Sequence, residues 1–172
     1  MVMLSSIHQN GFAQINMRNV TSKLLNNKII DFDLNSIDEI YFKYSSLAFA
    51  KRYIDKSLYP LLFAMIDGIS NPLITFRVQN LEKGFCFGHG RPHLDGMGKK
   101  DEIHRLYICG DSGTKTDFSL MPPGNIWEFG GDLLHAAAPV SKSGKRMLLR
   151  VSQCNLSKRD FIEKSMPTSY IG

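Results

Sequence analysis

The chain has 172 residues, of which 43% are hydrophobic and 22% charged, and this composition is that of one globular domain rather than a disordered or fibrous protein. It contains no run of eighteen apolar residues and no basic start followed by an apolar stretch, so we expect no membrane span, no secretory signal and a cytoplasmic location. The formal net charge of +5 comes from basic residues spread along the chain without a nucleic-acid-binding motif, which makes nucleic acid a less favoured partner than a small molecule or a peptide.

The first part of the chain, residues 1–71, is predicted to form a helical buttress. One helix is expected over residues 37–58, because an Asn-Ser pair before acidic residues is a typical helix start and the apolar residues then recur at a spacing closer to 3.6 than to 2. Pro60 interrupts this pattern, and a second short helix is expected over residues 61–66. Residues 28–34 alternate in part and are a candidate strand.

The pattern changes at residue 72, where short runs of β-branched and aromatic residues begin and turns rich in Gly, Pro, Asn and Asp separate them. We expect strands at residues 73–78, 85–87, 103–109, 116–120, 125–129, 133–137 and 146–154. Short strands behind a helical segment predict a single, mainly β domain with N-terminal helices. Its core, residues 72–156, is expected to be a double-stranded β-helix (a jelly-roll, cupin-like fold), followed by a C-terminal tail, residues 157–172.

A histidine and an aspartate two positions apart, His93 and Asp95, are the centre of the functional interpretation. In an extended segment, residues i and i+2 project to the same face, so both side chains can bind one cation. A later histidine, His135, would complete a set of two histidines and one carboxylate. That set leaves metal positions open for a co-substrate and O₂, as in non-haem Fe(II) oxygenases. The His-x-Asp spacing alone is a weak signal, because it also occurs by chance.

Other metal sites fit the sequence less well. His89 and His93 are four residues apart, as in a helical zinc pair, but the glycines and the proline around them argue against a helix there. The three cysteines form no CxxC pair, so neither a zinc ribbon nor a disulfide framework is expected. We interpret His89 as a structural or rim histidine and His104, inside a strand pattern, as a wall residue.

Arg146 lies eleven residues after His135 and opens a predicted strand. With the period of two, Arg146, Leu148, Arg150 and Ser152 share one face of that strand. An arginine fork makes two parallel charge-assisted hydrogen bonds to a carboxylate, so either arginine is suited to hold a dicarboxylate. Two inward arginines would be costly in an apolar core unless they contacted anions.

Several pieces of sequence between residues 76 and 152 follow one another in a familiar order. They are the strand and turn 76–84, His93-Leu94-Asp95, the arginine-containing strand 105–108, the Gly-x-x-Trp stretch within 121–129, and the segment from His135 to Leu149. Together they resemble the superfamily of Fe(II)- and 2-oxoglutarate-dependent oxygenases. The resemblance is closest to the aspartyl/asparaginyl β-hydroxylase branch, which includes the bacterial cis-type proline hydroxylases. The chain departs from that branch at residues 136–139, where Ala-Ala-Ala-Pro stands in place of a segment that usually contains an asparagine.

This resemblance implies a role for each site residue. The implied Fe(II) ligands are His93, Asp95 and His135, and the implied anchor of the distal carboxylate of 2-oxoglutarate is Arg146. Arg105 would be a second co-substrate contact, and Arg150 either that or a substrate contact. Arg150-x-Ser152 also resembles the Arg-x-Ser of other oxygenase branches, so the choice between Arg146 and Arg150 as the main anchor stays open. The implied reaction uses O₂ and converts 2-oxoglutarate to succinate and CO₂ while a substrate C–H bond is hydroxylated.

Three functions remain open from the sequence. The first is a hydroxylase of an amino acid, free or within a peptide, and a surplus of predicted inward arginines favours a substrate with a carboxylate. The second is an oxygenase acting on a nucleobase, a lipid or a secondary metabolite. The third is a non-enzymatic, cupin-like binding protein whose histidines are structural. Iron-dependent turnover of 2-oxoglutarate separates the first two from the third.

Overall fold

In the part of the chain that the structure describes, the secondary structure is mainly antiparallel β-sheet, with two short α-helices. The computed structural model describes residues 21–23, 32–88, 90–110, 114–115, 120–121, 123–164 and 168–170. Its largest sheet has six strands, and every neighbouring pair in it is antiparallel. In spatial order the strands are β1 (Thr21–Lys23), β8 (Ile126–Gly130), β5 (Ile103–Cys109), β10 (Gly144–Gln153), β3 (Leu73–Leu81) and β2 (Ile40–Ser46).

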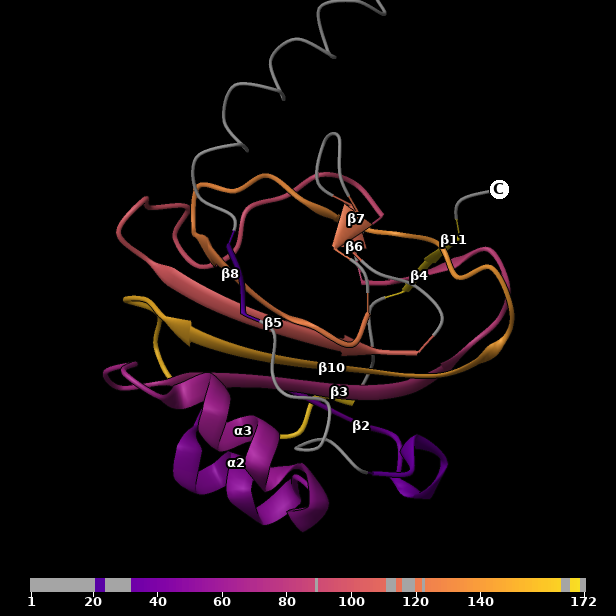
Figure 1. Cartoon of the computed structure of the whole chain (residues 1–172), viewed down its shortest axis with the longest axis horizontal. Helices are drawn as coiled ribbons and strands as arrows, with labels where there is room; N and C mark the ends of the chain where they lie inside the picture. The colour runs from indigo at the N-terminus through magenta and orange to yellow at the C-terminus, as the bar shows by residue number, and fades with distance from the viewer. Residues whose placement is uncertain are drawn as a thin grey trace, which may run out of the picture.

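Two helices cover one face of this sheet (Figure 1). They are α2 (Leu47–Tyr53) and α3 (Tyr59–Ile66), with the short 3₁₀ turns η2 (Leu34–Ser36) and η3 (Lys56–Leu58) before them. Ser46 caps α2 by accepting a hydrogen bond from the backbone N–H of Phe49. Pro60 lies in the first turn of α3, where a missing N–H removes no helical hydrogen bond.

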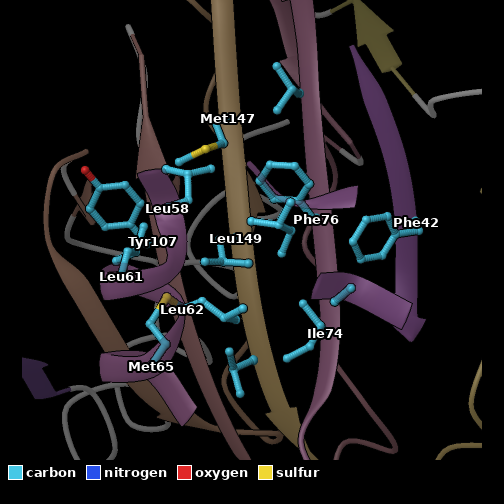
Figure 2. Packing of buried hydrophobic residues seen from close by; sticks show 14 of the residues in the cluster. Phe42, Leu58, Leu61, Leu62, Met65, Ile74, Phe76, Tyr107, Met147 and Leu149 are labelled. Atoms are coloured by element: carbon cyan, nitrogen blue, oxygen red, sulfur yellow. The ribbon is translucent and has the colours of Figure 1, made fainter. Parts of the chain in front are cut away.

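The main hydrophobic core lies between these helices and the sheet (Figure 2). From the helical side it takes Leu58, Leu61, Leu62 and Met65, and from the sheet Phe42, Ile74, Phe76, Tyr107, Met147 and Leu149. Burying one such side chain contributes about 1.5–3 kcal/mol, so this cluster fixes the helices on the sheet. Successive residues of a strand point to opposite faces, and the residues between these core positions therefore point to the other face of the sheet.

A second layer of short strands lies against that other face (Figure 1). It contains β4 (Phe85–Phe87) paired with β11 (Thr168–Tyr170), and β6 (Thr114–Lys115) paired with β7 (Leu120–Met121) and β9 (Ala136–Ala137). Phe87 of β4 and Met121 of β7 belong to two smaller apolar clusters, against both of which Leu148 of the large sheet packs. Val140, in the connection after β9, is in the same cluster as Phe87. We call the face of the six-stranded sheet that is turned toward this layer the inner face.

Most of the predicted strands are present, and the mainly β expectation is confirmed. The ranges of β4 and β5 match those predicted, and β3, β8 and β10 differ at their ends. The predicted strand 133–137 is reduced to β9, while residues 116–119 of another lie outside the described residues. The sequence pattern does not predict β1 or β11. None of the described helices has the length and hydropathy needed to cross a membrane.

The predicted helix over residues 37–58 is wrong in its first half, because residues 40–46 form the edge strand β2. The register between β2 and β3 shifts between Phe42 and Ser45, and Tyr44 has a positive φ of 50°. Such a bulge adds a residue to the strand, so the spacing of its apolar side chains departs from two and imitates a helical period. The second short helix is confirmed as α3. No strand is present at residues 32–34, and residues 28–31 of that candidate lie outside the described residues.

Candidate metal centre

The three predicted metal ligands lie where the two groups of short strands meet. His93 and Asp95 follow the end of β4, and His135 directly precedes β9. The backbones of His93 and His135 form an antiparallel bridge, in which each N–H donates to the other residue's carbonyl oxygen at 2.9 and 3.0 Å. This bridge brings together two segments that are more than forty residues apart in the chain.

Each of these side chains offers one ligand atom, and the three atoms lie within 4.8 Å of one another. His135 Nε2 is 3.1 Å from Asp95 Oδ2, and the centroids of the two imidazole rings are 4.6 Å apart. Asp95 and His135 are buried, whereas His93 is half-buried. The cluster is therefore walled by protein on most sides and reaches solvent at His93.

Backbone carbonyl groups fix which ring nitrogen of each histidine carries the proton. His93 Nδ1 is 3.1 Å from the carbonyl oxygen of Arg91, and His135 Nδ1 is 3.0 Å from that of Leu133. A carbonyl can only accept a hydrogen bond, so Nδ1 is the donor in both rings, and in the neutral ring Nε2 has the lone pair that can bind a metal. This is the arrangement by which outer partners orient metal-binding histidines.

The charges around the cluster favour the protonation states that a metal requires. Burial alone would raise the pKa of Asp95, but the Arg150 guanidinium and His135 outweigh it and hold that pKa well below its usual range. Burial, and then the neighbouring His135, lower the pKa of His93. A carboxylate that stays ionised beside a neutral imidazole is a donor set for a divalent cation.

Arg150, on the inner face of β10, holds the carboxylate of Asp95. Its Nη1 donates to Asp95 Oδ1, and its guanidinium carbon lies 5.1 Å from the centroid of the Tyr44 ring. The Tyr44 hydroxyl accepts a hydrogen bond of 3.2 Å from the backbone N–H of Gly96. One oxygen of Asp95 is thus bound by protein, and the other, Oδ2, faces His135.

The glycine-rich loop after Asp95 is wrapped around a buried carboxylate, that of Glu102. The backbone N–H groups of Met97 and Lys99 donate to it at 3.0 and 3.2 Å. A Cβ on Gly96 or Gly131 would lie 2.5 or 2.2 Å from Glu102 Oε2, so only glycine fits at these two positions. Glu102 is not predicted from the sequence, because it directly follows Asp101 and no pattern indicates that the second of these two acids is buried and the first exposed.

His104 backs the cluster from β5 and is fully buried. Its Nδ1 is 2.9 Å from Ser152 Oγ, its Nε2 is 3.8 Å from Glu102, and its ring lies 5.6 Å from that of Phe129. Phe129 in turn contacts His135 edge-on, at 5.3 Å between centroids. His104 is thus a wall residue, as expected. His89 lies outside the described residues.

The structure brings two of the three predicted arginines to the inner face, and Arg105 to the opposite face. Arg146 is almost fully buried, with its guanidinium carbon 5.0 Å from the centroid of the Phe87 ring. Arg105 instead donates to Glu128 at 2.6 Å and to the carbonyl oxygens of Met65 and Asp67 at the end of α3. The period of two gives the reason, because His104 takes the inner face and its neighbour Arg105 must point to the helices.

The sequence of this chain matches no protein-family description and no curated protein. Among solved structures, it is similar to a truncated form of the viral collagen prolyl hydroxylase from Paramecium bursaria Chlorella virus 1. The TM-score is 0.48 at 13% identity, covering 80% of this chain and 90% of that one. The same viral enzyme in its 2OG complex gives a TM-score of 0.41 at 14% identity, covering 81% and 97%.

Proposed function

We propose that this protein is a dioxygenase that depends on Fe(II) and 2-oxoglutarate and hydroxylates an unactivated C–H bond. The observation that carries the proposal is the cluster of His93, Asp95 and His135, whose ligand atoms lie within 4.8 Å of one another. Two imidazole nitrogens and one carboxylate oxygen form the facial set that non-haem Fe(II) oxygenases use. Three protein ligands leave room on an octahedral ion for a chelating co-substrate and O₂.

The donor atoms fit Fe(II) in charge as well as in type. Both imidazoles turn Nε2 inward because Nδ1 is bound to a carbonyl oxygen. Arg150 occupies Oδ1 of Asp95, which leaves Oδ2 as the single oxygen that faces His135 and restricts the carboxylate to one metal bond. When bound, Fe(II) with 2-oxoglutarate and O₂ supplies the oxidising power for C–H hydroxylation, and the chain supplies geometry and enclosure.

The co-substrate anchor in this proposal is Arg146. It shares the inner face of β10 with Arg150, and four residues of strand place the two side chains about 13 Å apart along the backbone. Arg146 is buried beside Phe87, where a charge-assisted pair with the distal carboxylate of 2-oxoglutarate is shielded from water. Arg105 has no part in the proposal, because it pairs with Glu128 on the opposite face.

The frame in this proposal is a double-stranded β-helix. The six-stranded sheet forms its larger wall, and β4, β6, β7, β9 and β11 contribute to the smaller one. The bridges from Cys86 to Pro139 and from His93 to His135 connect the groups of short strands across the smaller wall. The metal ligands then lie at one end of the space between the walls, where such folds hold ligands.

For the substrate we propose an amino acid, free or within a peptide, on the strength of the sequence resemblance. The test is succinate formation from 2-oxoglutarate by the Fe(II)-loaded protein, measured with a panel of amino acids and short peptides and, separately, with nucleotides and single-stranded DNA. We expect turnover to rise above the uncoupled background with at least one amino acid or peptide. If only nucleotides or single-stranded DNA stimulate turnover, the substrate is a nucleic acid and not an amino acid. If no condition gives iron-dependent succinate formation, the protein is a cupin-like binding protein and not an oxygenase.

A further inference from the structure

A third arginine, Arg77 of β3, lies on the inner face beside the two discussed above. In the antiparallel register of β3 and β10, Gln79 is opposite Arg146 and Thr75 is opposite Arg150. Arg77 lies between these two positions of β3, so it is a diagonal neighbour of both arginines. Diagonal neighbours on one face of a sheet are about 7–8 Å apart, which is within reach of long side chains.

Arg77 and Arg146 contact the same aromatic ring. Their guanidinium carbons lie 4.1 and 5.0 Å from the centroid of Phe87, and both residues are buried, with 4% and 1% of their surface exposed. The side-chain oxygen of Gln79 accepts hydrogen bonds from Nε and Nη2 of Arg77 at 3.2 and 2.7 Å, which fixes the plane of its guanidinium. Burial lowers the pKa of Arg77 to about 10, so it is still charged at neutral pH.

The pair brings two positive charges close together. Arg77 and Arg146 place both of their guanidinium groups around the ring of Phe87. Like charges repel each other in a medium of low dielectric constant. A carboxylate has two oxygens and can accept from both guanidiniums, which turns that repulsion into two charge-assisted contacts.

The surfaces beside the pair match the rest of a five-carbon dicarboxylate. Leu148 is opposite Arg77 in the register and lies between Arg146 and Arg150 along β10. It packs in the apolar cluster that contains Phe87. Methylene groups that run from the metal cluster toward Arg146 would therefore pass over apolar side chains, while the charged end would reach the two arginines.

We propose that Arg77 and Arg146 together bind the distal carboxylate of 2-oxoglutarate, which makes Arg77 a second co-substrate-binding residue. This rests on the proposed function and replaces the role that the sequence suggests for Arg105. Gln79 is then a positioning residue, because it holds the Arg77 guanidinium in a fixed plane beside Phe87.

The test compares two ligands in the same protein sample. Mn(II)-loaded protein is titrated calorimetrically with 2-oxoglutarate and with 2-oxopentanoate, which has the same chain length but a methyl group in place of the distal carboxylate. The measured quantity is the ratio of the two dissociation constants, which does not depend on the fraction of protein that is folded. In Arg77→Gln we expect the preference for 2-oxoglutarate to fall roughly tenfold or more, with binding of 2-oxopentanoate unchanged.

Two further variants sharpen the comparison. Arg77→Lys keeps the charge but loses the planar fork, so its preference should lie between those of the wild type and Arg77→Gln. Lys145→Gln removes one positive charge next to Arg146, but Lys145 points to the other face and donates to the carbonyl oxygens of Asn35 and Ile37. Its preference should equal that of the wild type.

An unchanged ratio in Arg77→Gln would overturn the assignment. If the ratio is unchanged because both ligands bind more weakly by the same factor, Arg77 only supports the fold. Failure of the Mn(II)-loaded wild type to bind either ligand would be a different result. That outcome would overturn the proposed function itself and the assignment with it.

Discussion

At the scale of single residues, the two carboxylate oxygens of Asp95 have different partners. Arg150 binds Oδ1, and Oδ2 faces His135 at 3.1 Å. Carbonyl oxygens bind Nδ1 of both histidines, so Nε2 is the ring nitrogen that can bind a metal, and one ligand atom of each residue lies within 4.8 Å of the others. The protein thus fixes the ligand atoms before any ion arrives, and a preformed set costs less ordering on binding than a flexible one.

Removing any ligand should abolish stoichiometric binding of a divalent cation. We expect His93→Ala, Asp95→Ala and His135→Ala each to lose Mn(II) binding in calorimetry, because two remaining ligands hold the ion far more weakly. Circular dichroism should show that the β-structure is retained, since these side chains are not part of the main core. Full-strength binding by one of the variants would remove that residue from the metal site.

Arg146 and Arg150 should affect different ligands. Losing a bidentate charge-assisted pair costs about 2–4 kcal/mol, so Arg146→Ala should weaken 2-oxoglutarate binding by roughly thirtyfold to a thousandfold. Arg150→Ala should have the smaller effect on 2-oxoglutarate and the larger one on Mn(II), because it frees Oδ1 of Asp95. Calorimetric titration with each ligand measures both effects. The reverse order for 2-oxoglutarate would make Arg150 its main anchor.

His104 should make the metal-free protein less stable in mild acid. Burial, and then Arg150, lower its pKa to about 4, from an ordinary value of about 6.5. The folded protein therefore favours the neutral form of His104. Between about pH 6.5 and pH 4, His104 binds a proton in the unfolded chain but not in the folded one. Stability is fully present above pH 6.5 and falls by up to about 3 kcal/mol as the pH drops to 4.

Urea denaturation between pH 4 and pH 7.5 in the presence of a chelator measures this effect. His104→Gln cannot take up the proton, and its amide still suits a hydrogen bond to Ser152 Oγ, so its stability should depend less on pH over that interval. The same pH dependence in the variant and the wild type would show that His104 is not the group responsible.

At the scale of elements, contacts between segments far apart in the sequence position the loop after Asp95 and the segment before β9. Glu102 accepts from the backbone N–H groups of Met97 and Lys99 and lies against Gly131, which follows β8 directly. This single carboxylate therefore ties the loop that carries one metal ligand to the segment that leads to another. A substitution that displaces the Glu102 carboxylate should therefore reduce both the stability of the fold and the affinity of the metal site.

Gly131→Ala tests this tie. The added Cβ would lie 2.2 Å from Glu102 Oε2 and 2.7 Å from the carbonyl oxygen of Lys99, so the loop must shift. We expect a loss of about 1–3 kcal/mol in the free energy of unfolding, together with weaker Mn(II) binding. Gly144→Ala is the matched control, because nothing lies within 4 Å of its added Cβ. Equal stability of the two variants would contradict the role given to Glu102.

Strand pattern explains why much of this arrangement could be predicted and where prediction ends. Alternation in residues 146–152 places Arg146, Leu148, Arg150 and Ser152 on one face, and the structure agrees. Alternation does not say which face is covered by helices, so the side taken by Arg105 could not be read from the sequence. The bulge at Tyr44 gives the apolar residues of β2 a spacing like that of a helix, so this strand was predicted as a helix. Glu102 was missed because its partners depend on the path of a loop.

At the scale of the whole molecule, the C-terminal segment closes the structure around the site. The backbone N–H groups of Arg159 and Glu163 donate to the carbonyl oxygens of Tyr44 and Tyr41, so this segment covers the free edge of β2. Asp160 accepts from both the N–H and the hydroxyl of Ser46. The chain then reaches the opposite layer, where β11 pairs with β4 just before the metal ligands. An exposed sheet edge is thereby protected from pairing with other chains.

The two layers give the proposed function its physical basis. Helices and the main core hold the six-stranded sheet from one side, and the arginines of β3 and β10 discussed above lie on its other, inner face. The short strands hold the three ligand residues against that face. Metal and 2-oxoglutarate would bind next to each other in this space, so each should strengthen the binding of the other by the same factor.

Calorimetric titration of 2-oxoglutarate into the protein, with Mn(II) and with a chelator, tests this central claim most directly. We predict one Mn(II) ion per chain and one 2-oxoglutarate that binds at least tenfold more tightly when Mn(II) is present, with that gain absent in Asp95→Ala. No Mn(II) binding by the wild type, or equal affinity for 2-oxoglutarate with and without the ion, would contradict the account.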